Sequence, residues 1–170
     1  VLQLLGHSAA IDTFVADTEA VETQVLHAEV THAESSADVV ALLTANRVLN
    51  IAAQWMGEPG RSDLIGLGIS DVVEQSSTMW VPVSLLSNTD VQKAFQSASF
   101  RAHDAKPIMR SLLHVGIDLR GLVLDTAIAA YLIDPAQAKY SLADLVVKYS
   151  GVRYPDDEPA NSGQLDLDAT

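Results

Sequence analysis

The chain has 170 residues, 48% of them hydrophobic, which is enough for one domain with its own core and too hydrophobic for a disordered chain. It has no cysteine, so disulfides, thiolate metal sites and thiol nucleophiles are excluded. Its formal net charge is −12, and residues 1–46 contain no Lys or Arg, which argues against autonomous binding to nucleic acid because such binding depends on neutralising phosphates.

The composition along the chain predicts three parts. Residues 1–22 mix apolar and acidic residues at loose helical spacing, and we expect a connector from a preceding domain. Residues 23–154 carry the regular apolar patterns of a folded domain. Residues 155–170 are rich in acidic residues, Pro and Gly, which is typical of a mobile tail or linker. No apolar run approaches the roughly 18 residues that span a bilayer, and no secretion signal begins the chain, so we expect a cytoplasmic protein without membrane contact.

The first half of the domain predicts a strand, a helix and a three-strand meander. The alternation of residues 24–31 favours a strand. Ser35 and Ser36 offer an N-cap for a helix that Asn46 closes. Three apolar segments then follow with short connections, which implies antiparallel pairing because a parallel pair needs a crossover of about a dozen residues. These strands are expected over residues 47–55, 63–73 and 78–84.

The second half alternates helices with strands, which indicates parallel additions to the same sheet. Asn88 or Thr89 caps a helix, and residues 99–103 form the next strand. Asp104 is expected to cap a helix that ends at Gly116 in a left-handed conformation. Residues 121–124 read as a short buried strand. Asp125 caps a helix over residues 126–133, and a last helix begins at Ser141.

The most specific sequence features are four short segments with characteristic spacing. They are His103-Asp-Ala-Lys, Leu124-Asp-Thr-Ala, Ala130-Tyr-Leu and Ser141-Leu-Ala-Asp-Leu. The series resembles the second half of the 3′→5′ proofreading exonuclease domain of bacterial family A DNA polymerases (DNA polymerase I). The resemblance covers roughly residues 23–150. It implies an α/β fold with a ribonuclease-H-like mixed sheet, in which an antiparallel meander precedes β-α-β-α units flanked by helices.

The resemblance also implies a two-metal site, because these exonucleases hold two Mg²⁺ or Mn²⁺ ions with four carboxylates. Such ions clamp the attacking and leaving oxygens of a phosphoryl displacement and need several anionic ligands. The four matching positions here are Ala52, Gln54, Ile108 and Ala143. None is a carboxylate. We therefore expect no catalytic residue, no bound metal and no cofactor.

The expected function follows from that loss. The segment would be a non-catalytic, vestigial exonuclease-like domain of a monomeric DNA polymerase I active in DNA replication and repair. It would act as a structural spacer between covalently linked 5′-nuclease and polymerase domains, with weak or no DNA binding of its own. Where the family meets a single-stranded DNA end, this chain has His103, Asp104 and Lys106. The alternative for these three residues is a helix cap with solvated charges.

Two other functions stay open. The first is a metal-dependent exonuclease that uses displaced carboxylates, namely Asp104, Asp125 and Asp144. Against it, Asp125 matches a helix N-cap, and Asp144 matches a capping box with Ser141. The second is a protein-interaction module whose acidic first half meets a basic partner.

Two further patterns have a simpler interpretation. His27, Glu29 and His32 suggest a zinc site, but strand alternation puts His32 on the opposite face from the other two. Trp55 and Trp80 suggest stacking platforms for bases, yet tryptophans on strands are more often core or half-core residues.

Overall fold

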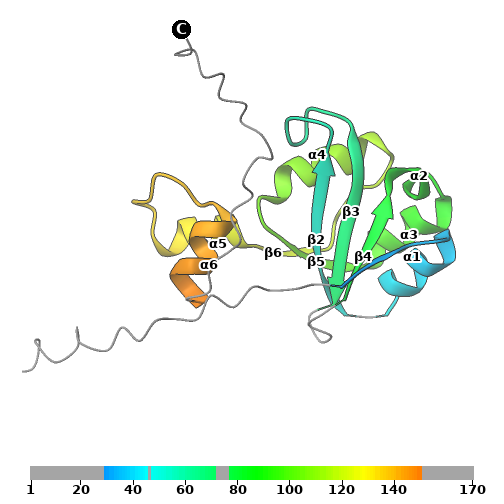
Figure 1. Ribbon diagram of the computed structural model, residues 1–170, viewed down its shortest axis with the longest axis horizontal. Helices are drawn as coiled ribbons and strands as arrows, with labels where there is room; N and C mark the ends of the chain where they lie inside the picture. The colour runs from blue at the N-terminus through cyan, green and yellow to red at the C-terminus, as the bar shows by residue number, and fades with distance from the viewer. Residues whose placement is uncertain (1–28, 46, 72–76, 151–170) are drawn as a thin grey trace, which may run out of the picture.

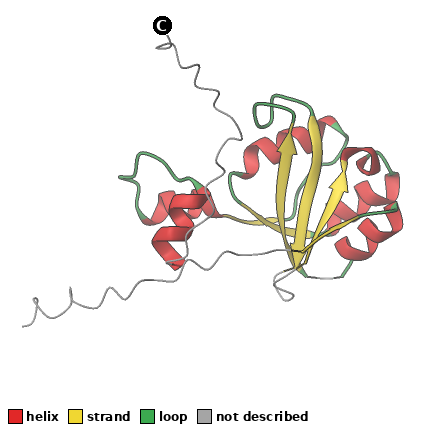
Figure 2. Ribbon diagram, viewed as in Figure 1, coloured by secondary structure: helices red, strands yellow, loops and turns green. Residues whose placement is uncertain are grey.

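The computed structural model describes residues 29–45, 47–71 and 77–150, which form a sheet with helices packed around it (Figures 1 and 2). The strands are β1 (Glu29–His32), β2 (Val48–Trp55), β3 (Leu64–Asp71), β4 (Ser77–Pro82), β5 (Ser99–Ala102) and β6 (Leu122–Asp125). The helices are α1 (Ser36–Leu43), α2 (Val83–Leu86), α3 (Thr89–Ser97), α4 (Ala105–His114), α5 (Thr126–Ile133) and α6 (Leu142–Ser150). The predicted parts 1–22 and 155–170 lie outside the described residues.

The strands of the described chain form one mixed sheet in the order β1-β4-β3-β2-β5-β6. The predicted meander is confirmed, because β2 pairs antiparallel with β3 and β3 pairs antiparallel with β4. The parallel additions are confirmed as well, since β5 pairs with β2 and β6 with β5 in parallel. The first strand, β1, closes the other edge in parallel with β4.

The core lies between the sheet and helices α1, α3 and α4. Its largest fully buried side chains include Phe95 and Phe100, whose rings are stacked with their centroids 5.5 Å apart. Leu49, Ile69 and Leu112 belong to the same cluster. Figure 1 shows α1, α2 and α3 gathered beside β4, whereas α5 and α6 extend past β6 on the opposite side.

Local capping explains most of the helix boundaries. At α1, the Ser35 hydroxyl accepts the Asp38 N–H, and the Asp38 carboxylate accepts the Ser35 N–H at 2.8 Å. The hydrogen bond donated by the Ser35 hydroxyl lowers the pKa of Asp38. Asn88 caps α3 through the N–H groups of Asp90 and Val91, as predicted. Gly116 has φ 86°, the left-handed conformation expected after α4. Asn46 lies outside the described residues.

Three sequence predictions are wrong in detail. Strand β4 ends at Pro82, which is the N-cap residue of α2, so Val83 and Ser84 begin that helix instead of ending a strand. β6 is not buried: it is an edge strand, and Val123 and Leu124 are exposed. Asp104 does precede α4, but its side chain makes no capping hydrogen bond, and its backbone is left-handed with φ 50°.

Candidate functional site

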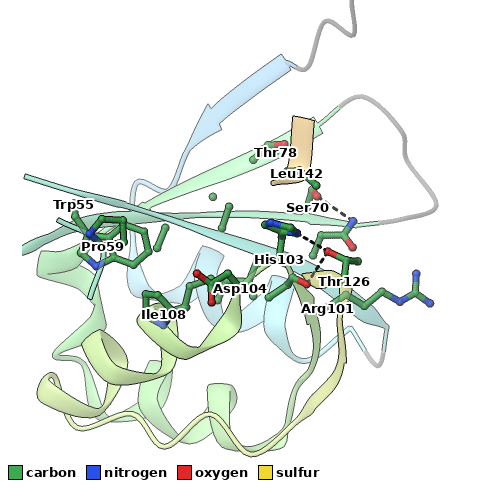
Figure 3. A pocket seen from close by; sticks show the side chains of 17 residues that line it. Trp55, Pro59, Ser70, Thr78, Arg101, His103, Asp104, Ile108, Thr126 and Leu142 are labelled. Atoms are coloured by element: carbon green, nitrogen blue, oxygen red, sulfur yellow. Dashed lines mark hydrogen bonds between the residues drawn. The ribbon is translucent and has the colours of Figure 1, made fainter. Parts of the chain in front are cut away.

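A cavity of about 560 Å³ lies where β2, the start of α4 and the start of α6 meet (Figure 3). β2 contributes residues 50–53 and Trp55, and the strand β5 with the turn into α4 contributes residues 101–104. Pro107 and Ile108 come from α4, and Leu142 is the first residue of α6. The remaining lining residues are Pro59, Gly68, Ser70, Thr78 and Thr126.

Apolar side chains supply most of this lining. Arg101, His103 and Asp104 are the charged or titratable residues among the described residues that line it. Figure 3 shows His103 directed toward Thr126, and the His103 Nδ1 lies 2.9 Å from the Thr126 Oγ1. Thr126 in turn donates to the Ala102 carbonyl at 3.4 Å. The polar groups near His103 thus largely bind one another.

The structure brings two of the four positions that the resemblance assigns to carboxylates into this cavity. Ala52 and Ile108 both line it, and the Ile108 side chain is only 3% exposed. Gln54 and Ala143 are exposed and do not line it. Ala53 and Leu142, their neighbours in sequence, do.

The pairing of β2 with β3 is regular up to Gln54, which pairs with Gly66. The register then shifts between Gln54 and Trp55. An irregularity of this kind re-aims side chains near functional sites.

The predicted nucleic-acid contacts lie close together at the start of α4. His103 and Asp104 line the cavity, whereas the exposed side chain of Lys106 lies outside the lining. The left-handed backbone of Asp104 is a conformation that Asp and Asn tolerate better than most residues. The structure therefore places two of the three candidates on the cavity wall.

Asp125 organises the neighbouring helix starts. Its Oδ1 accepts the N–H groups of Ala127 at 2.9 Å and Ile128 at 3.4 Å, which confirms the predicted N-cap of α5. The same Oδ1 accepts the Asp104 N–H at 3.1 Å, and Oδ2 accepts the Ala105 N–H at 2.7 Å, at the start of α4. A carboxylate offers about four lone-pair sites. Four backbone N–H groups therefore bind the Asp125 carboxylate, three at Oδ1 and one at Oδ2.

Asp144 is held in a different way. The Ser141 hydroxyl accepts the Asp144 N–H at 3.2 Å, which is one half of the predicted capping box. The Asp144 carboxylate accepts a hydrogen bond from the Ser141 hydroxyl. Asp144 does not line the cavity, and Asp125 is committed to backbone donors. Among the described residues that line the cavity, Asp104 is therefore the one carboxylate.

This donor set does not fit a pair of hard cations, which need several anionic oxygens around each ion. Across residues 29–45, 47–71 and 77–150, no group of three His, Cys, Asp or Glu side chains is placed to hold a metal ion. Glu29 and His32 of the suggested zinc site are exposed on β1, and His27 lies outside the described residues.

The two tryptophans are half-buried parts of the fold, as the simpler interpretation predicts. The Trp55 Nε1 donates to the Ser111 Oγ at 2.8 Å, which ties the end of β2 to α4. Trp80 lies across Gly66, where a Cβ would come within 2.5 Å of the indole Cζ2. The Trp55 ring also forms part of the cavity wall.

Comparison with known proteins decides the family. Residues 58–159, more than half of the chain, match the family model described as "DNA polymerase I, ribonuclease H-like domain". The chain belongs to this family. The resemblance deduced from the four sequence segments is thereby confirmed. The matched range begins after β2, so Ala52 and Gln54 lie outside it.

Individual relatives agree with this assignment. A 47-residue stretch is 45% identical to a DNA polymerase I of Mycobacterium leprae, covering 28% of this chain and 5% of that protein. The structure superposes on Pol1 from M. smegmatis, solved with a DNA primer-template and dNTP, with a TM-score of 0.56 and 24% identity. That match covers 74% of this chain and 23% of the matched chain, which is described as the POL domain of Pol1. The chain therefore spans a small part of the polymerases it matches.

The fold is shared more widely among nucleases. Escherichia coli RNase D, an exoribonuclease, superposes with a TM-score of 0.62 at 16% identity, covering 78% of this chain and 36% of that chain. An RNase D from Trypanosoma brucei in complex with RNA gives a TM-score of 0.62 at 11% identity. That match covers 75% of this chain and 49% of the RNase D chain. These matches confirm the predicted ribonuclease-H-like sheet. No helix in the described ranges has the length and apolar character needed to cross a membrane.

Proposed function

We propose that this exonuclease-like domain of DNA polymerase I is non-catalytic and serves as a structural spacer in a longer polymerase. The observation that carries the proposal is the composition of the cavity. Ala52 and Ile108 line it where the family resemblance calls for metal-binding carboxylates. Phosphodiester hydrolysis by two metals requires a cage of anionic oxygens, and a wall of this kind cannot supply one.

The state of the nearby carboxylates supports the same proposal over the displaced-carboxylate alternative. Asp125 accepts four backbone N–H groups, three of them at Oδ1, so a metal bound through Oδ1 would compete with the caps of α4 and α5. Asp144 is engaged by Ser141 outside the cavity. Losing both caps would cost about 1 kcal/mol for each helix. The hydrogen bonds of Asp125 and Asp144 thus support a structural role for both residues over metal binding.

We also propose which domains flank this one in its parent chain. A 5′-nuclease domain would precede it and the polymerase domain would follow it in one monomeric, cytoplasmic chain that acts in DNA replication and repair. The net charge of −12 favours a domain that makes little DNA contact alone, with the neighbouring domains holding the DNA.

The decisive experiment uses the full-length chain without dNTPs, in Mg²⁺ and separately in Mn²⁺. The substrate is a single strand labelled at its 5′ end, with phosphorothioate linkages at that end to block a 5′-nuclease. We expect no stepwise shortening from the 3′ end. A ladder of shortened products that disappears when the 3′-terminal linkage is also a phosphorothioate would overturn the proposal.

A further inference from the structure

A second pocket, of about 430 Å³, lies between the loop that joins β2 to β3 and the last turn of α4. The loop and the start of β3 contribute residues 60–64, and the end of α4 contributes Ser111, His114 and Val115. Val83, the first residue of α2, completes the lining. This pocket shares no lining residue with the cavity at Ala52 and Ile108, so it is a separate site.

The loop that forms one wall of the second pocket is held in place by close contacts. The Glu58 carbonyl accepts the N–H groups of Arg61 at 3.1 Å and Ser62 at 2.9 Å. Gly60 has φ 69°, and a Cβ there would lie 2.8 Å from the Pro107 Cα at the start of α4. Because the loop packs this closely on the helix, the wall is formed before a ligand arrives, as is usual for small-molecule sites.

Ser111 places a buried hydroxyl in the wall of this pocket. Within the described chain it is the one buried polar side chain, with 8% of its surface exposed. Its Oγ accepts the indole N–H of Trp55 at 2.8 Å. A hydroxyl has one proton and two lone pairs, so the proton of Ser111 is left for an acceptor. Buried polar groups are normally fully partnered, and a ligand oxygen would complete this one.

Side chains of both charges line the same pocket. The Arg61 Nη1 lies 3.1 Å from the Glu58 Oε1, but both side chains are more than 60% exposed, so this pair is weak and the guanidinium can turn toward a ligand. Asp63 makes no ion pair within the described residues. The Nδ1 of His114 donates to the Arg110 carbonyl at 2.8 Å, which leaves Nε2 for a ligand.

This combination of groups selects the class of ligand. A doubly charged phosphate would meet a single Arg and would be repelled by Asp63. A zwitterion matches better, because its carboxylate fits the guanidinium of Arg61 and its ammonium group fits the Asp63 carboxylate. The remaining wall is apolar at Leu64, Val83 and Val115, which suits an aliphatic side chain.

We infer that the second pocket binds a free α-amino acid with an aliphatic side chain. The carboxylate of the ligand accepts hydrogen bonds from Arg61 and from the Ser111 hydroxyl, and its ammonium group donates to Asp63. Its side chain contacts Val83 and Val115. The site goes beyond the proposed spacer role and does not depend on it, because it lies outside the cavity that carries that proposal.

Isothermal titration calorimetry of the full-length chain tests the class with three probes of similar size. L-Leucine carries both charges, 4-methylpentanoate lacks the ammonium group, and 3-methylbutylamine lacks the carboxylate. We expect L-leucine to bind with a Kd of the order of 1 mM or tighter, and each singly charged probe to bind about tenfold or more weakly. A Kd for L-leucine above about 10 mM, or equal affinity for a singly charged probe, would overturn the inference.

Two substitutions assign the binding to this pocket. Arg61→Gln and Asp63→Asn each remove one charge and leave the core intact, because both side chains are exposed. Each should weaken L-leucine binding about tenfold or more. Arg120→Gln, exposed and outside the pocket, is the control and should leave the Kd unchanged. Unchanged affinity in either pocket variant, or an equal loss in the control, would place the amino acid elsewhere and refute the site.

The hydrogen bond between Trp55 and Ser111 gives a local spectroscopic readout. 5-Fluorotryptophan is placed at position 55 alone in the full-length chain and, in a matched control, at position 80 alone, because Trp80 lies across Gly66 and outside the pocket. We expect L-leucine to shift the fluorine resonance at position 55, with the Kd found by calorimetry, and to leave position 80 unchanged. A resonance at position 55 that stays in place while L-leucine binds would rule out the contact with Ser111.

Discussion

The carboxylate of Asp125 accepts the backbone N–H of Ala105 at 2.7 Å, although the two residues are 20 positions apart in the sequence. Through this bond and three others, one side chain holds the first turns of α4 and α5 together. Both turns border the cavity, at Asp104 and Thr126. In this chain the geometry of the cavity wall therefore depends on a residue that caps two helices.

Asp125→Ala should destabilise the domain by about 2 kcal/mol, because it removes the cap of two helices at about 1 kcal/mol each. Asp125→Asn keeps the Oδ1 acceptor and loses the Oδ2 acceptor that binds the Ala105 N–H. Its effect should therefore be about half as large. Urea unfolding measures both. Asp118→Ala is the control, since the exposed pair of Asp118 with Arg120 should contribute less than about 1 kcal/mol. Equal stability of Asp125→Ala and the control would contradict the shared cap.

Gly66→Ala should destabilise the sheet by about 1–3 kcal/mol, the usual cost of overpacking a filled site. The new Cβ would lie 2.5 Å from the Trp80 Cζ2 and 2.7 Å from the Val81 carbonyl oxygen. Gly68→Ala is the matched control on the same strand, because its Cβ would meet the Thr78 Cγ2 at an ordinary 3.5 Å. Thermal unfolding followed by tryptophan fluorescence compares the two. A Gly68→Ala variant that loses as much stability as Gly66→Ala would refute the steric explanation.

The pair of Asp134 and Lys148 should make the α5–α6 region sensitive to acid. The hydrogen bond and charge of Lys148 lower the pKa of Asp134 below its ordinary value. A group whose pKa is lower in the folded state stabilises the fold above its unfolded pKa, and this contribution disappears as the pH falls through the folded value. The loss is therefore expected below about pH 4.

Titration of the Asp134 carboxyl by NMR checks this directly. Lys148→Met should raise the pKa of Asp134 toward its ordinary value, whereas Lys139→Met, in the loop between α5 and α6, should leave it unchanged. The same Asp134 pKa in the wild type and in Lys148→Met would show that the pair does not form in solution.

Features set by neighbouring residues were predictable from the sequence. The caps at Ser35, Asn88 and Asp125 involve residues two or three positions away, and each was predicted. The left-handed Gly116 follows from the same local rules. The meander was predictable because its short connections leave only antiparallel pairing.

Features set by distant contacts were not predictable. Nothing local to Asp104 indicates that Asp125 would cap α4 in its place. Val83 and Ser84 carry a strand-like pattern, yet they turn into α2 behind Pro82. The apolar run of residues 121–124 predicts a buried strand, yet Val123 and Leu124 are exposed because β6 lies at the edge of the sheet.

The two edges of the sheet differ in how they are protected against unwanted strand pairing. The outer strand β1, Glu-Val-Thr-His, carries an acidic residue and a histidine, which discourage another chain from joining the sheet. The other outer strand, β6, is Leu-Val-Leu-Asp, and its aspartate is engaged by the helix caps. Production of this segment by itself should therefore favour self-association along β6, and solubility screens that add charge at Val123 should relieve it.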